Sequence, residues 1–311
     1  MSWFDVVYAA VKSPFANLWP LLVLPFVAGL ACEFAARRLQ PTRADWRLAA
    51  ALAAAPGLLF LALSLIILWR IVTHSHWQLE WQHVLKYQVT ALVAGAILAR
   101  AAWRAWRRHA ALSQLMRLAV PASGRLGNAA ARAGIDVRLL PCSQPECFVA
   151  GVFDPKVYLS AGAVDRLSDR ELDAALRHER SHIRGRDTAI LAALGFLGDL
   201  GWFGRSAVTA YHQSRERTAD EAAVQASGPI DLASALLALA RSPAQPLPAI
   251  GIAGTAPATW RLHAILGNEP VDHIRRFALT TAVAGLAMTF SFAAWPYAQT
   301  YIIGLLCPCH L

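Results

Sequence analysis

Long stretches without a charged side chain constrain this sequence more than any other feature. No Asp, Glu, Lys or Arg occurs in the 20 residues between Lys12 and Glu33, in the 22 residues of 48–69, or anywhere in 277–311. A helix of about 20 residues rises about 30 Å, which matches the hydrocarbon core of a bilayer. These stretches predict membrane-spanning helices at about 13–32, at about 48–69 and after residue 276.

A shorter apolar stretch lies between Lys86 and Arg100. Its 13 residues are too few to cross a bilayer, but a helix over 84–102 spans it when both flanking cations extend toward the headgroups. We therefore expect four spanning helices, three of them before residue 103. The first lacks a basic start beyond Lys12 and a good processing site before Cys32, so we expect a retained helix and not a cleaved signal.

The distribution of positive charge orients these helices. The composition, 56% hydrophobic and 16% charged, excludes disorder, and a formal net charge of +9 would also fit a nucleic-acid binder. The arginines instead gather in the first loop, after the third span and directly before the fourth: Arg37, Arg38, Arg43, Arg47, Arg100, Arg104, Arg107, Arg108, Arg117, Arg275 and Arg276. Because cationic loops stay in the cytoplasm, this pattern predicts both termini outside, residues 103–276 in the cytoplasm and no direct contact with nucleic acid.

The segment 103–276 has the pattern of a small α+β domain. Short apolar runs at 137–140, 147–152 and 157–159 predict strands. Ser168 and Glu171 form a capping box, which predicts that a helix starts at Ser168. The chain is thus predicted to be a mostly α membrane protein with a membrane domain over 1–102, a cytoplasmic α+β domain over 103–276, and a last span with a short tail over 277–311.

The predicted helix carries the pattern H-E-x-x-H at 178–182. Residues four apart lie one above the other on a helix, so His178 and His182 can reach one metal ion while Glu179 points at a water molecule on it. This predicts a zinc site with Glu179 as catalytic base.

A third protein ligand is expected on a separate helix. Glu216 and Asp220 lie four apart in YHQSRERTADEAAVQ, so Glu216 can bind the metal while Asp220 orients a ligand histidine. Glu221 and His212 are the rival ligands. Four residues of this stretch stay open as the group that stabilises an oxyanion: Tyr211, His212, Arg215 and Arg217.

Three runs make this region resemble a known family: FVAGVFDPKVYLS, LSDREL and HERSHIRGRD, all within 147–187. They are similar to the BlaR/MecR-type membrane metallopeptidases, the sensor-transducers of bacterial β-lactam resistance. The resemblance covers 103–276 and the order of the spans, and implies a gluzincin-like zinc peptidase. It implies a Zn²⁺ site with ligands His178, His182 and Glu216, with Glu179 as base and Asp220 behind a ligand. Those sensors continue into an extracellular penicillin-binding domain, whereas this sequence ends at Leu311, so we expect no direct β-lactam sensing.

The function implied by the resemblance is regulated proteolysis at the bacterial cytoplasmic membrane. The protein substrate would be cytoplasmic, for example a transcriptional repressor, and a partner protein could supply the signal. An extended substrate could add as a strand along 148–152 or 157–159. Two alternatives stay open: a quality-control protease like the HtpX-type membrane metallopeptidases, and a non-proteolytic signalling scaffold.

Two features lie outside this interpretation. Cys142 and Cys147 are expected to be free thiols in a reducing cytoplasm, whereas the tail 307–310 is interpreted as an unstructured terminus and not as a redox or metal sensor. The apolar stretch 188–204 contains Asp199, so we expect a core helix, or one that dips into the membrane surface, and not a span.

Overall fold

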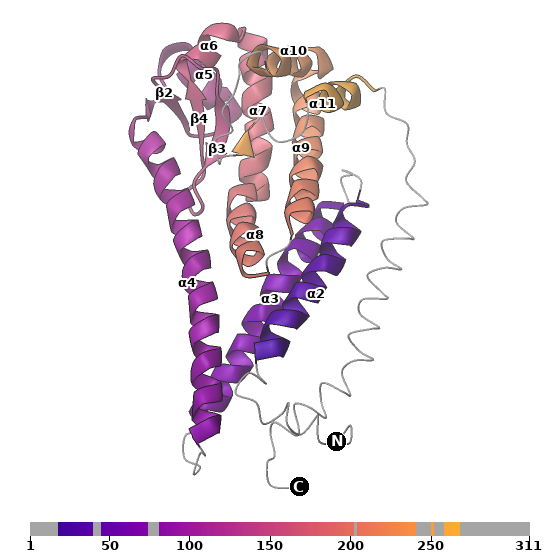
Figure 1. The fold of residues 1–311 in the computed structure, drawn as a ribbon. Coiled ribbons are helices and arrows are strands. Elements are labelled where there is room, and N and C mark those ends of the chain that lie inside the picture. The colour runs from indigo at the N-terminus through magenta and orange to yellow at the C-terminus, as the bar shows by residue number, and fades with distance from the viewer. Residues whose placement is uncertain are drawn as a thin grey trace.

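Three long helices lead into a small sheet flanked by shorter helices (Figure 1). This computed structural model describes residues 18–39, 45–73, 81–201, 204–240, 250–251 and 258–267. The long helices are α2 (Leu18–Ala36), α3 (Asp45–Thr73) and α4 (Trp81–Arg117). The predicted boundary at residue 102 lies inside α4, which continues past the apolar stretch without a break.

The membrane prediction is met in part. Among the described residues, one helix is long and apolar enough to cross a membrane by length and composition, α3 over Asp45–Trp69. The apolar part of α2, Leu22–Ala36, is shorter, and α4 holds the predicted span 84–102 without reaching that criterion. The fourth predicted span and the cysteine tail lie outside the described residues, and so does the start of the first span.

Helix α8 (Asp187–Gly201) lies between α3 and α4 (Figure 1). A Cβ on Gly57 of α3 would stand 2.3 Å from the carbonyl oxygen of Leu197, so only glycine permits this approach of the two backbones. Asp199 accepts hydrogen bonds from Arg104 (3.1 Å) and Arg108 (2.7 Å) of α4. The apolar stretch with its acidic residue is thus a helix packed against two others, with its carboxylate paired.

Within the described residues, the sheet has five short strands in the order β1-β2-β4-β3-β5. They are β1 (Val120–Pro121), β2 (Val137–Leu140), β3 (Cys147–Ala150), β4 (Lys156–Ser160) and β5 (Ile250–Gly251), and all pairs are antiparallel except β2 with β4. The three predicted strands are confirmed, but the second ends at Ala150 and not at residue 152. One expectation is wrong: β4 lies between β2 and β3, so 157–159 offers no free edge to a substrate. The outer edge of β3 is paired with β5 at Phe148 and Val149.

Helices cover both faces of this sheet. One face packs in a single apolar cluster with α5 (Gly124–Ala133), α7 (Asp169–Gly185) and α10 (Pro229–Ala240). The other face, with Phe148 and Tyr158, packs against the end of α4 through Leu112 and Met116. The short α6 (Ala161–Arg166) connects β4 to α7. The end of α4 therefore belongs to the core of the α+β part.

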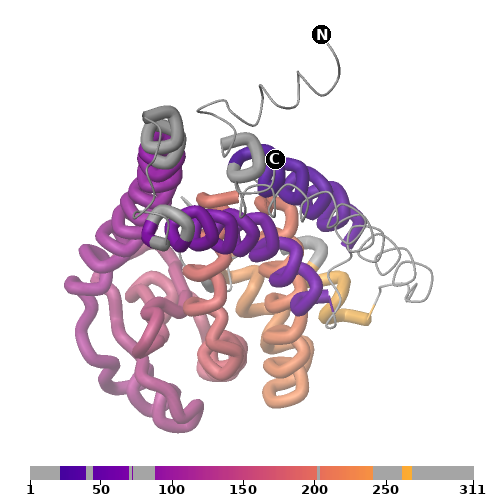
Figure 2. Tube along the Cα trace, turned by 90° about the horizontal axis from the view of Figure 1, so that it is seen from below, coloured from indigo at the N-terminus to yellow at the C-terminus, as the bar shows by residue number. Residues whose placement is uncertain are grey.

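Two further helices belong to this part of the molecule. They are α9 (Arg205–Ser227), which runs along α7, and α11 (Ala258–Ile265), which contacts α9 and α10. Seen from below, α3 crosses in front of this part (Figure 2). Glu33 of α2 accepts hydrogen bonds from the backbone N–H groups of Gly204 (3.3 Å) and Ser206 (3.2 Å), so a residue of α2 caps the start of α9.

Candidate metal centre

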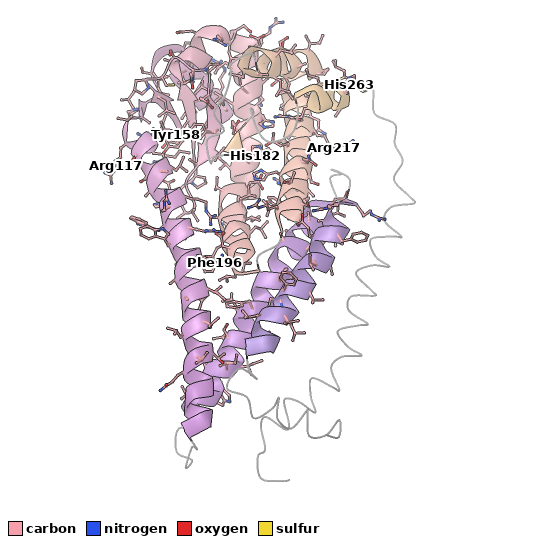
Figure 3. All side chains as sticks on the ribbon, viewed as in Figure 1. Arg117, Tyr158, His182, Phe196, Arg217 and His263 are labelled. Carbon is pink, nitrogen blue, oxygen red and sulfur yellow. The ribbon has the colours of Figure 1, made fainter. Side chains whose placement is uncertain are left out.

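Three side chains converge between α7 and α9, where Figure 3 shows His182. Nε2 of His178 lies 3.1 Å from Nε2 of His182 and 3.5 Å from Oε2 of Glu216, and Nε2 of His182 lies 3.5 Å from Oε1 of Glu216. All three side chains are buried. Two ligands about 2.1 Å from a tetrahedral zinc ion lie about 3.4 Å apart. The donor set and its spacing therefore fit such an ion; that these residues bind one stays a prediction.

The local sequence explains why α7 presents both histidines inward. The predicted capping box is confirmed: Oγ of Ser168 accepts from the backbone N–H of Glu171, and the Glu171 carboxylate accepts from the N–H of Ser168 at 2.7 Å. The buried face of α7 starts with Leu172 and continues to His178 and His182. Because the helix start is fixed, the two histidines keep one face, toward α9.

Each histidine has a carboxylate behind it. Nδ1 of His178 lies 3.0 Å from Oδ1 of Asp220, and Nδ1 of His182 lies 2.7 Å from Oδ2 of Asp187. An ionised carboxylate accepts the Nδ1–H proton and leaves Nε2 as the free donor atom for a metal. Asp220 thus lies where the sequence predicts a supporting group, behind His178.

Asp187 is a residue that sequence reasoning missed. It starts α8 directly after Arg186, whose positive φ of 53° ends α7 in the left-handed region and turns the chain back. No glycine or asparagine at position 186 signals this turn. The one available hint is that Asp187 ends the run HERSHIRGRD.

Two buried arginines hold these carboxylates. Arg215 donates from Nε to Asp187 at 2.7 Å, and Tyr211 donates its hydroxyl hydrogen to the same Oδ1 at 3.0 Å. Arg261 of α11 donates from Nε to Oδ2 of Asp220 at 2.9 Å, and its Nη1 lies 2.8 Å from Oε2 of Glu216. Arg261 was not predicted, because it follows Glu216 by 45 residues and belongs to no local motif.

The remaining candidates lie elsewhere. Glu221, a rival ligand, is paired with Arg217 at 3.5 Å on the exposed side of α9. His212, the other rival, stands one turn before Glu216 but is not among the clustered donors, and burial lowers its pKa. Tyr211 and Arg215 are hydrogen-bonded to Asp187 behind His182, so these two do not face a substrate through those atoms.

Glu179 is fully buried at the side of α7 nearest to the sheet. Burial, and then the charge of Glu179, raise the pKa of the Cys147 thiol on β3 well above its usual range. The base predicted for catalysis therefore stands beside the first residue of β3. Among the described residues, Cys142 and Cys147 form no disulfide.

The buried charges of the site sum to a negative net charge that a divalent cation would balance. Four buried carboxylates, of Glu179, Asp187, Glu216 and Asp220, face two buried guanidinium groups, of Arg215 and Arg261. With neutral histidines this leaves two negative charges, which one divalent cation balances.

The pKa values describe the same site without a cation. Burial alone would lower the pKa of His178, but hydrogen bonds with Asp220 and Glu216 raise it to about 9. Burial would raise the pKa of Glu216, but the charge of Arg261 and the hydrogen bond with His178 hold it well below its usual range. The carboxylate is therefore ionised, and without a cation the site holds a proton on His178.

Comparison with known proteins agrees with this chemistry. The family model described as BlaR1 peptidase M56 matches residues 11–263, most of the chain. Protease HtpX homolog 2 of Methanosarcina mazei is 35% identical over 69 residues, 22% of this chain and 24% of that protein. Protease HtpX homolog 2 of Methanosarcina acetivorans is 34% identical over 61 residues, which is 19% of this chain and 21% of that protein. The chain thus spans about a quarter or less of these curated relatives, and no solved structure matches it.

Proposed function

The chain belongs to the BlaR1 peptidase M56 family, a family of membrane peptidases, and we propose that it is a zinc endopeptidase that cleaves a cytoplasmic protein at the membrane. One observation carries the proposal. His178, His182 and Glu216 are buried, and their donor atoms all lie within 4.8 Å of one another on two helices. Three protein ligands would leave a fourth position to a reactant, as in catalytic zinc sites.

A zinc ion held there would supply a Lewis acid that polarises the scissile carbonyl and lowers the pKa of a water molecule. Glu179, the residue after the first ligand, would accept a proton from that water and give it to the leaving amine. Asp220 and Asp187 hold the two imidazoles through Nδ1, so that Nε2 of each would be free to bind the cation.

The substrate main chain would bind along β3. The Cys147 thiol of this strand lies next to Glu179, so an extended peptide paired with β3 passes the predicted base. In this structure β5 takes the edge at Phe148 and Val149. A substrate strand must therefore displace β5 or pair beyond it.

Contacts with the long helices support a regulated enzyme. Glu33 of α2 caps α9, the helix of Glu216, and Trp46 of α3 lies 5.6 Å from the guanidinium carbon of Arg215. A signal that moves either helix would reach the site through these side chains. We propose that the cut protein is a transcriptional repressor, that a partner supplies the signal, and that residues 103–276 face the cytoplasm of a bacterium.

The test is the variant E179Q in the full-length protein, purified in detergent. Zinc content and proteolysis are measured on wild type and variant, together with a proteome-wide search for cut products in cells. We expect one zinc per chain in both proteins and cleavage by wild type only. Cleavage retained by E179Q would contradict the catalytic role of Glu179, and a zinc-bound wild type without any cut product would favour a signalling scaffold.

Quality control is the second candidate function, because the curated relatives are named as HtpX homologues. The same experiment separates the two. Cleavage of casein and many misfolded membrane proteins would favour quality control, and cleavage of a single cytoplasmic target would favour regulation.

A further inference from the structure

Arg261 is the least expected side chain in the site, because it is a cation 1% exposed beside predicted metal ligands. We propose that Arg261 is a positioning residue that fixes Glu216 and Asp220 in the geometry required to bind the metal. This inference rests on the proposed function. It assigns α11, beyond the helices that carry the ligands, a part in building the site.

The guanidinium stands behind the ligands and does not take the place of the metal. Its Nη2 lies 3.5 Å from Nδ1 of His178, whereas Nε2 of that ring faces Glu216 and His182. The two ring nitrogens point in opposite directions. Arg261 is therefore on the outer side of His178, away from the side on which Nε2 meets Glu216 and His182.

Only an arginine can make this set of contacts. Nε and Nη2 bond the two carboxylate oxygens of Asp220 side by side, and Nη1 reaches Oε2 of Glu216 at 2.8 Å. A guanidinium has donors in a fixed planar fork that suits such a pair, whereas a lysine ammonium is a point charge. The side chain thus sets the angle between two carboxylates and does more than neutralise them.

Two consequences follow for the metal ligands. Asp220 is held so that it can accept the Nδ1 proton of His178, which orients that imidazole. Glu216 is held at Oε2, so its Oε1 keeps its place 3.5 Å from Nε2 of His182. Without the guanidinium, two buried carboxylates one turn apart on α9 would repel each other and rotate away from these positions.

The experiment compares zinc binding by full-length wild type, R261M and R132M in detergent. Arg132 forms a similar pair with Asp173 through Nε and Nη2, at 3.3 and 2.8 Å, but on the surface, so R132M is the matched control. The measurements are the zinc Kd from chelator competition and the visible spectrum of the Co²⁺-substituted protein. For R261M we expect a Kd weaker by about 10- to 100-fold and a changed cobalt spectrum, and for R132M wild-type values.

If R261M does not fold, R261K replaces it in the experiment. A lysine keeps the positive charge but lacks the planar set of guanidinium donors. The expected Kd of R261K lies between those of wild type and R261M, with a cobalt spectrum that differs from wild type. A folded R261M or R261K with the wild-type Kd and spectrum would overturn the inference and leave the proposed function intact. A wild type that binds no zinc would overturn both.

Discussion

The two histidines of the site are supported by the same kind of chain, an arginine behind an aspartate behind an imidazole, but the two chains are built differently. Arg215 holds Asp187, which holds His182, and Tyr211 adds a third donor to Asp187. Arg261 holds Asp220, which holds His178.

The difference lies in what each arginine touches next. Arg215 lies under the ring of Trp46, a residue of α3, which is long and apolar enough to cross a membrane. Arg261 also forms an ion pair with Glu216, a predicted ligand. The first chain thus joins the site to a long apolar helix. In the second chain, Arg261 of α11 contacts groups that belong to the site itself. A substitution in the first chain should therefore also weaken the packing of the site against α3. A substitution in the second chain should mainly affect metal binding.

The largest effect is expected for D187A. The variant leaves Arg215 and Tyr211 buried without their acceptor, and loss of one partner of a buried pair costs about 3–5 kcal/mol. We expect the free energy of unfolding, measured by thermal unfolding in detergent, to fall by that amount. We expect zinc affinity to fall about 10- to 100-fold.

D220A sharpens the comparison. Arg261 keeps its ion pair with Glu216 in this variant, so the loss of stability should be smaller than for D187A. D173A, which removes a surface ion pair, is the control and should cost about 0–1 kcal/mol. Equal losses for D187A and D220A would contradict the difference between the two chains.

A pH effect is expected next, in metal-free protein. The folded-state pKa of His178 is about 9, above its ordinary value of 6.5. The proton on His178 therefore stabilises the folded state by up to about 3 kcal/mol below pH 6.5. This stabilisation is lost as the pH rises through about 9.

The measurement is thermal unfolding of chelator-treated protein across that pH range. D220N should flatten the profile because Asp220 holds the proton on His178, and D187N should keep it. Saturating zinc should abolish the decline, since a bound metal requires neutral His178. A profile in chelator that is flat for wild type would contradict the proton on His178.

A smaller effect is expected for G185A. A Cβ on Gly185, the last residue of α7, would lie 2.1 Å from Nη2 of Arg215, so the guanidinium must shift away from Asp187. The expected cost is about 1–3 kcal/mol in thermal unfolding. In G195A the new Cβ would meet Arg108 at 3.7 Å, an ordinary contact, so G195A is the control. Equal behaviour of both variants would show that Arg215 is not confined.

The smallest effect is expected for W46L. It removes the ring over Arg215 and the edge contact with Tyr211, at a centroid distance of 6.4 Å. A cation–π contact of this kind contributes about 1 kcal/mol. Zinc release, followed as the rate of zinc transfer to a chelator, should quicken slightly. W103L on α4, away from the site, should leave that rate unchanged; a change of equal size in W103L would mean that Trp46 has no special link to the site.

Much of the site could be predicted from the sequence because its signals are local. The capping box at Ser168 and the spacing of His178 and His182 depend on one helix, and Glu216 and Asp220 on another. The three strands were visible as short apolar runs between turns. That the family match covers most of the chain agrees with the resemblance read from the same runs.

The missed residues depend on contacts between distant parts. Asp187 reaches His182 only because Arg186 adopts a positive φ, which its residue type does not signal. Arg261 reaches Asp220 only after α11 packs on α9 and α10. The free edge expected at 157–159 was wrong for the same reason, since strand order depends on which segments meet.

The central claim is that His178, His182 and Glu216 hold one divalent cation. X-ray absorption spectroscopy of the zinc-loaded full-length protein tests it most directly. The account predicts one zinc per chain with two imidazole nitrogens and at least one oxygen at about 2.0–2.2 Å, and loss of the imidazole signal in the double variant H178A/H182A. A wild type with no tightly bound zinc, or a spectrum without imidazole scattering, would contradict it.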